Sequence, residues 1–212
     1  MSKLDAFYAM KVGIELVKAS AAEPGELETC DMEVDRIMDE STGKLNLKHY
    51  QRTLDGKRPI RSTDNLYNVA ERVLPAFTKM MNEIMAEAGE GVEAVVATLK
   101  LKERAEKKAT NDYGTRECDG GGPPIGWVFD IVRGKFVCKS GTSMKKVVAL
   151  LEKDPRIKAT LNFKNRFRNP TANGYGDYLL HVVFQAGILV HVCEIQVHLR
   201  AVTEYVVVNP AM

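Results

Sequence analysis

The chain has 212 residues, 45% of them apolar and 27% charged, with 30 Lys and Arg against 28 Asp and Glu. It holds no apolar run of about 18 residues for a membrane span, and its four cysteines form no CxxC pair for a zinc ribbon or dense disulfide framework. The formal net charge of +2 argues against a dedicated nucleic-acid coat. We expect a cytoplasmic protein that does not engage a membrane.

The charge is unevenly distributed along the chain. Up to Val95 there are 12 basic and 17 acidic residues, and from Val96 onward there are 18 basic and 11 acidic residues. The second half is therefore basic enough to attract a polyanion.

Residues 1–92 are predicted to form a helical N-terminal region. An acidic stretch from Glu23 to Glu40 is interpreted as a solvated helix or loop, and the polar stretch from Ser41 to Asp64 as a connector. The amphipathic stretch from Leu66 to Ala88 predicts a helix, which Pro75 should kink or end in its first half.

Residues 93–212 alternate between helical and strand patterns. We expect one helix from Val92 to Tyr113, a Gly-rich connector, and a strand from Gly126 to Cys138. A short helix, an extended stretch and a hairpin that turns at Ala186-Gly187 should follow. This order predicts an α/β (α+β) fold, with a mixed sheet of about five strands flanked by helices.

Three cations follow one another at four-residue spacing in the predicted helix, namely Lys100, Arg104 and Lys108. Like charges at this spacing destabilise an isolated helix, and an anionic partner such as a polyphosphate would justify them. A solvated helix face is the competing interpretation.

Asp130 lies within the apolar run WVFDIVRGKF and is followed by Arg133 and Lys135. A carboxylate in such a run must face solvent or have a partner. Mg²⁺ takes one or two carboxylates together with substrate phosphates, so Asp130 is a candidate metal ligand. A surface salt bridge to Arg133 is the alternative.

The last predicted strand carries an acid, an amide and an imidazole on one face. Strand alternation places Glu194, Gln196 and His198 in one row. Glu194 can bind a metal or accept a proton from an attacking hydroxyl. A solvent-facing edge strand would show the same row.

The segment KNRFRNPTANGY combines cations, a turn and an aromatic side chain. Lys164, Arg166 and Arg168 alternate along it, and Asn173-Gly174 is a turn sequence that delivers Tyr175. Such a set suits a nucleotide, because cations bind phosphates and an aromatic ring stacks on a base. A basic loop with a structural tyrosine is the other interpretation.

Taken together, the motifs KxxxRxxxK, DIVRGKF, KNRFRNPTANGY and EIQVHL, between Val95 and Val202, resemble the synthetase domain of the RelA/SpoT family, the alarmone (p)ppGpp synthetases. The resemblance implies a nucleotidyltransferase-like domain over 93–212 and a Mg²⁺-dependent pyrophosphokinase that uses ATP and a guanine nucleotide, GDP or GTP.

Within that family, the aspartate and glutamate that handle Mg²⁺ and catalysis correspond to Asp130 and Glu194, and the tyrosine that stacks on guanine corresponds to Tyr175. The resemblance further implies nucleotide contacts from the remaining candidates, namely Lys100, Arg104, Lys108, Arg133, Lys135, Lys164, Arg166, Gln196 and His198. The alternative hypothesis is a catalytically weak or inactive nucleotide- or RNA-binding module. RNA as an acceptor and an oligomeric assembly both stay open.

Overall fold

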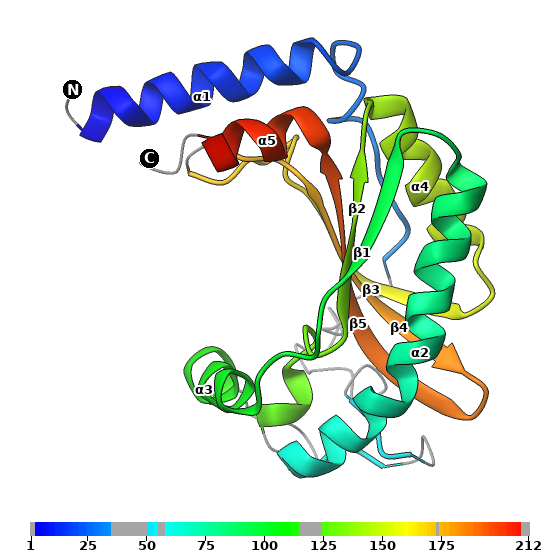
Figure 1. The fold of residues 1–212 in the computed structure, drawn as a ribbon. Helices are drawn as coiled ribbons and strands as arrows, with labels where there is room; N and C mark the ends of the chain where they lie inside the picture. Colours follow the sequence, from blue (N-terminus) through cyan, green and yellow to red (C-terminus); the bar gives the residue numbers. More distant parts are fainter. Residues whose placement is uncertain (1–2, 35–50, 55–57, 115–123, 173, 209–212) are drawn as a thin grey trace, which may run out of the picture.

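The fold was analysed in a computed structural model, which describes residues 3–34, 51–54, 58–114, 124–172 and 174–208. Figure 1 shows helices packed around one sheet. The helices are α1 (Lys3–Ala19), α2 (Thr63–Ala88), α3 (Lys102–Tyr113), the 3-10 helix η2 (Pro124–Trp127), α4 (Gly141–Lys153) and α5 (Arg200–Val208). The strands are β1 (Val92–Val96), β2 (Arg133–Cys138), β3 (Ile157–Asn165), β4 (Tyr178–Ala186) and β5 (Leu189–Leu199). Within the described residues, no helix is both long and apolar enough to cross a bilayer.

The five strands form one mixed sheet in the order β1-β2-β5-β4-β3. The central pair, β2 and β5, is parallel, and the other three pairs are antiparallel. The predicted α+β class, with a mixed five-stranded sheet flanked by helices, is confirmed.

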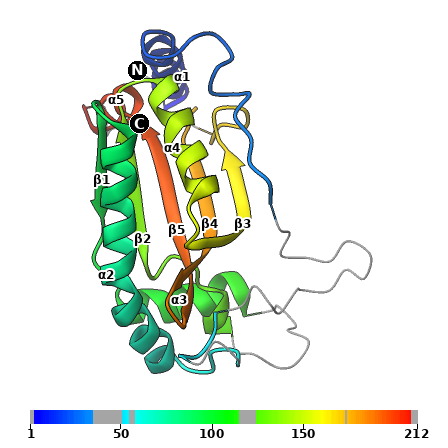
Figure 2. The same cartoon turned by 90° about the vertical axis from the view of Figure 1, so that its right-hand side faces the viewer.

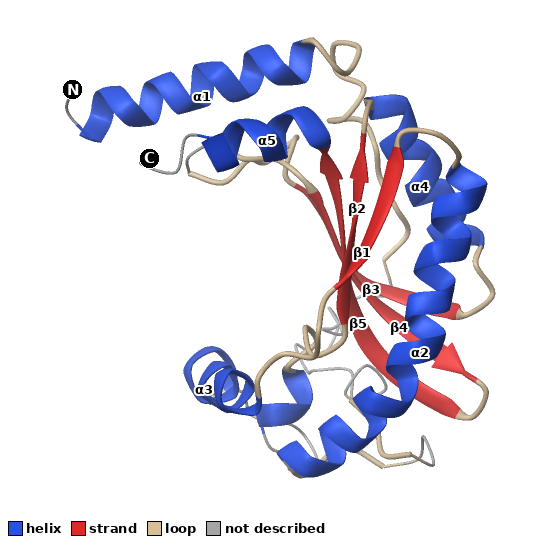
Figure 3. Cartoon of the chain, viewed as in Figure 1, coloured by secondary structure: helices blue, strands red, loops and turns tan. Residues whose placement is uncertain are grey.

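The two faces of the sheet differ. Helices α2 and α4 cover one face, whereas on the other side α1 and α5 lie over one end and α3 over the other (Figures 1 and 3). Strand alternation turns Cys193, Ile195 and Val197 toward α2 and α4, into the hydrophobic core. The residues that alternate with them on β5, namely Glu194, Gln196 and His198, therefore point to the opposite face of the sheet.

Helix α2 runs without interruption through Pro75, so the predicted end at this proline is wrong. Ser62 caps its N-terminus by accepting a hydrogen bond from the Asn65 amide. Its apolar stripe lies in the same core as the sheet. The boundary between residues 92 and 93 thus remains a prediction, drawn between two segments that share one core.

The segment that follows α1 runs along the outer side of β3, as Figure 2 shows. The Asn165 amide anchors this segment by donating hydrogen bonds to the backbone carbonyls of Leu27, Glu28 and Cys30. Its acidic side chains are partly paired, since Asp31 lies 3.5 Å from Arg168. The second part of the acidic stretch, residues 35–40, lies outside the described residues.

The predicted helix from Val92 to Tyr113 is wrong in its first part. Residues Val92–Val96 are strand β1, because the sequence VEAVV suits a half-buried edge strand beside β2. The helix α3 begins only at Lys102. Lys100 therefore precedes the helix that carries Arg104 and Lys108.

The predicted strand from Gly126 to Cys138 is also shorter than expected. Pro124–Trp127 forms η2, and β2 begins at Arg133. The residues between η2 and β2 are apolar because they are buried. Phe129, for example, packs with Trp127 of η2 in a small second hydrophobic cluster. Asp130 consequently lies in a buried loop before β2.

Candidate functional site

Asp130 accepts hydrogen bonds from two lysines of the predicted cationic set. Its Oδ2 atom lies 2.5 Å from Lys100 Nζ and 2.9 Å from Lys108 Nζ. The Asp130 side chain is only 10% exposed. Two lysines that sequence analysis placed on one helix thus converge from a loop and from α3 on the same oxygen atom.

The backbone around Lys100 is fixed on both sides. Its amide donates to the Ile131 carbonyl at 3.2 Å, and its carbonyl accepts from the hydroxyl of Tyr67 on α2. Arg104, one turn before Lys108 on α3, is exposed. The predicted cationic set therefore comprises two lysines that contact Asp130 and a third cation, Arg104, that is exposed to solvent.

Burial and ion pairing act in opposite directions on Asp130. Burial would raise the pKa of this carboxyl, but hydrogen bonds from Lys100 and Lys108 outweigh burial and hold the pKa below its usual value. For Lys108, burial would lower the pKa, but Asp130 and the nearby charge of Glu194 raise it above its usual value. The charges of both candidate catalytic acids thus act on Lys108.

Glu194, Gln196 and His198 form one row on the face of β5 opposite α2 and α4, as predicted. Gln196 Nε2 donates to Glu194 Oε1 at 3.1 Å, and Gln196 Oε1 lies 2.9 Å from His198 Nε2. Glu194 Oε2 lies 3.4 Å from His181 Nε2 on the neighbouring strand β4. The row is therefore a connected hydrogen-bond network.

Tyr175 lies at the far end of that row. Its hydroxyl is 2.7 Å from His198 Nδ1, and the two ring centroids are 6.1 Å apart. Nearby, Arg166 donates to the buried carboxylate of Asp177 at 3.0 Å. Burial raises the pKa of Asp177 above its usual value, although the charge of Arg166 opposes that shift.

The remaining predicted cations occupy three places. Arg133 donates to the Asp130 carbonyl at 3.2 Å and pairs in register with Glu194. Lys135 is the register partner of Gln196. Lys164 is exposed on β3 and, with Arg166 and Asp31, lines a cavity of 310 Å³.

The Mg²⁺ that the resemblance implies would need oxygen ligands at this site. Among the described residues, no three His, Cys, Asp or Glu side chains are grouped to hold a metal by themselves. Mg²⁺ needs only one or two carboxylates when phosphates and waters complete its shell. Asp130 Oδ1 is buried and has no hydrogen-bond partner, so this atom fits such a role.

Three residues that support the site were not predicted from the sequence, namely Tyr67, His181 and Gln51. Tyr67 lies in the stretch for which only an amphipathic helix was predicted, and His181 lies in the predicted hairpin, where no role was assigned to it. Gln51 fell in a predicted connector, yet its buried side-chain amide bonds the backbone of Val128 and of Val192. Only the position of His181 could have been found beforehand, from the correct hairpin register.

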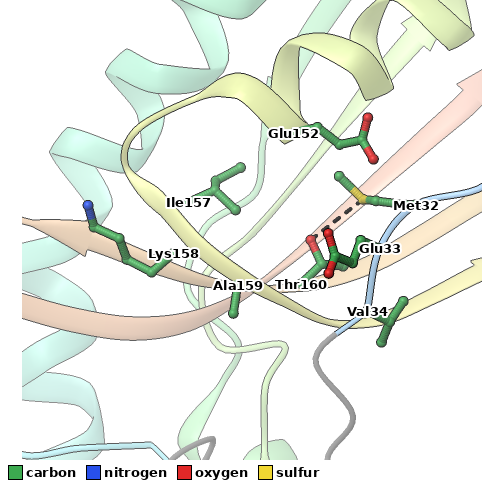
Figure 4. Close-up of a pocket in the computed structure, with 8 residues that line it drawn as sticks. All are labelled: Met32, Glu33, Val34, Glu152, Ile157, Lys158, Ala159 and Thr160. Carbon is green, nitrogen blue, oxygen red and sulfur yellow. Dashed lines mark hydrogen bonds between the residues drawn. The ribbon is translucent and has the colours of Figure 1, made fainter.

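A separate hollow of 630 Å³ lies at the outer edge of β3, between that strand, the end of α4 and the segment around Met32 (Figure 4). Thr160 donates a hydrogen bond to the sulfur of Met32 there. None of the predicted site residues lines this hollow. It lies apart from the row on β5.

The fold is that of the small alarmone synthetases. The small alarmone synthetase 2 from Bacillus subtilis is 17% identical, with a TM-score of 0.55 over 70% of this chain and 78% of that chain. The small alarmone synthetase 1 from the same organism, bound to its product pppGpp, is 13% identical, with a TM-score of 0.53 over 68% of this chain and 75% of that chain. No family model and no curated protein matches the sequence. The resemblance to alarmone synthetases is thus confirmed for the fold.

Proposed function

We propose that this protein is a pyrophosphokinase that transfers the β,γ-pyrophosphate of ATP to the 3′-hydroxyl of GDP or GTP. One observation carries the proposal: Asp130, with one buried oxygen unpartnered, lies beside two lysines in a fold shared with the small alarmone synthetases. Arg133 donates to the Asp130 carbonyl and pairs in register with Glu194, so the two acids lie close to the start of β2. In this proposal the cations bind phosphates and both acids serve the same site.

The donor half of the site comprises Lys100, Arg104 and Lys108. Their charges would bind the ATP phosphates and stabilise the negative charge that develops during transfer. Asp130 and Glu194 would hold Mg²⁺, which when bound polarises the phosphates and neutralises their charge. The lysines now on Asp130 would then turn to the phosphates.

The acceptor half lies toward Tyr175, whose ring would stack on the guanine base. Polar residues of the same face would contact the phosphates and ribose of the acceptor, namely Arg133, Lys135, Lys164, Arg166, Gln196 and His198.

The proposed transfer forms one bond, breaks one bond and moves one proton. The 3′-oxygen attacks the β-phosphorus of ATP, and the bond from that phosphorus to the α,β-bridging oxygen breaks. AMP leaves with the electron pair of the broken bond. Glu194 accepts the hydroxyl proton, directly or through one water.

A second candidate is a nucleotide- or RNA-binding module with weak or no catalysis. It is favoured by the ion pairs that Asp130 makes with Lys100 and Lys108, because these pairs balance the charge of the carboxylate. In that case the basic residues bind phosphates, and no pyrophosphate is transferred.

The decisive experiment incubates purified protein with Mg²⁺, ATP labelled in its β-phosphate, and GDP, GTP, ADP or tRNA as acceptor. We expect label on GDP or GTP, with loss of transfer in Asp130→Asn and Glu194→Gln. Glu204→Gln on α5, near Arg200, is the matched control and should retain activity. Nucleotide binding without transfer to any acceptor would instead establish the second candidate.

A further inference from the structure

We propose that His198 and Gln196 are positioning residues that connect the hydroxyl of Tyr175 to the carboxylate of Glu194. The inference rests on the proposed function, in which Tyr175 holds the acceptor base and Glu194 receives the proton of its hydroxyl. Binding of the base at one end of the row would then set the orientation of the carboxylate at the other end.

The direction of the hydrogen bonds follows from the available donors. The amide of Gln196 donates through Nε2 to Glu194 Oε1, so its Oε1 is the acceptor for His198 Nε2–H. His198 Nδ1 is then unprotonated and accepts from the Tyr175 hydroxyl. Each donor along the row therefore points toward Glu194.

Thr203 does not replace Tyr175 in this arrangement. Its hydroxyl lies 3.5 Å from His198 Nδ1 but also donates to the Leu199 carbonyl at 3.3 Å. Tyr175, at 2.7 Å, is the closer partner of the same nitrogen. Tyr175 is thus the main partner of Nδ1, as Gln196 is the partner of Nε2.

The second oxygen of Glu194 is held from β4. Asn162 Nδ2 lies 3.4 Å from His181 Nδ1, so the amide donates and leaves the proton of His181 on Nε2. That Nε2–H faces Glu194 Oε2 at 3.4 Å. Glu194 therefore accepts one hydrogen bond on each oxygen and retains lone pairs for a substrate.

The environment of the row favours a neutral imidazole. Burial, with the charges of Lys135 and Arg166, lowers the pKa of His198 to about 4. A neutral ring has one donor and one acceptor nitrogen, as the two bonds to Tyr175 and Gln196 require. His198 thus transmits orientation through two bonds of opposite polarity.

The test uses Tyr175→Phe, which keeps the ring for stacking and removes only the hydroxyl. We expect kcat to fall about fivefold with an almost unchanged KM for the acceptor, as for one lost neutral hydrogen bond. Tyr205→Phe, which removes a hydroxyl bonded to the Ala9 carbonyl on α1, is the matched control. A higher KM with unchanged kcat would overturn the proposal, because the hydroxyl would then serve only the base.

A spectroscopic readout separates this proposal from the proposed function. In protein with ¹⁵N-labelled histidine, NMR should show Nε2–H tautomers for His198 and His181. Tyr175→Phe should shift the ring resonances of both, whereas Tyr205→Phe should shift neither. If the wild-type protein transfers no pyrophosphate, the proposed function fails, yet a His181 response still supports the connection. A silent His181, or His198 protonated on Nδ1, would refute it.

Discussion

The side-chain amide of Gln51 bonds both backbone groups of Val192, as a neighbouring strand would do. Its Oε1 accepts from the Val192 amide and its Nε2 donates to the Val192 carbonyl, each at 2.9 Å. The same Nε2 lies 3.4 Å from the Val128 carbonyl. One side chain thus joins the strand that carries Glu194 to the loop that carries Asp130.

Replacing this amide should loosen both segments. We expect Gln51→Leu to lower the free energy of unfolding by about 2 kcal/mol, because buried backbone groups lose their partner. Urea denaturation measures this change. Gln185→Leu removes an amide bonded to Gly187 at the exposed hairpin turn and should cost much less; equal losses would contradict a special role for Gln51.

Lys108 should contribute directly to ATP binding if the proposed function is correct. We expect Lys108→Met to weaken ATP binding at least tenfold, since charge-assisted hydrogen bonds are worth about 1.5–3 kcal/mol. Titration calorimetry measures the dissociation constant. Lys102→Met, on the same helix but paired with exposed Asp64, is the control. An equal effect of both changes would indicate only loss of net charge.

Gly134 permits close packing of β2 on α2. A Cβ at this position would lie 2.9 Å from Met81 Cε and 3.3 Å from Phe77 Cε1. Gly134→Ala should therefore destabilise the protein by about 1–3 kcal/mol. In a double-mutant cycle, the cost of adding this methyl should be smaller in a Met81→Ala background. Purely additive effects would show that the steric contact is not the cause.

Two buried histidines should make the fold sensitive to acid. Burial lowers the pKa of His191 to about 3 and that of His198 to about 4. Below pH 6.5 the unfolded chain binds protons that the folded chain does not, so stability falls as the pH decreases toward these values. Each group contributes up to about 1.4 kcal/mol per pH unit.

This sensitivity can be assigned by substitution. His191→Leu should show a weaker decrease in the free energy of unfolding between pH 6.5 and 4 than the wild-type protein. Urea denaturation at several pH values provides the comparison. An identical dependence of the free energy of unfolding on pH in both proteins would mean that His191 has the same pKa in the folded and unfolded chains.

The hairpin illustrates how far the sequence determines the site. Alternation correctly predicted which face of β5 carries Glu194, because side-chain period is a local property. The turn was placed at Ala186-Gly187, whereas the observed loop is Gly187-Ile188 with Gly187 at a φ of +61°. This shift changes the register partner of Glu194 from Leu179 to His181.

The Asp130 region shows the opposite limit. Its residue types predicted an acid beside a cationic set, and the contacts to Lys100 and Lys108 agree. The predicted strand at Asp130 was wrong. The residues around Asp130 are apolar because tertiary packing buries them, and such a composition is also typical of a strand. No local sequence pattern pointed to Gln51, since its partners lie more than 70 residues away along the chain.

The continuous strand β5 sets the distance between the two ends of the row. Glu194 and His198 are four residues apart, which corresponds to about 13 Å along a strand. Inserting two residues between them would lengthen this span by about 7 Å and keep both side chains on one face. Inserting one residue would send them to opposite faces. In the proposed function, this spacing sets how far the reacting hydroxyl of an acceptor can lie from its base.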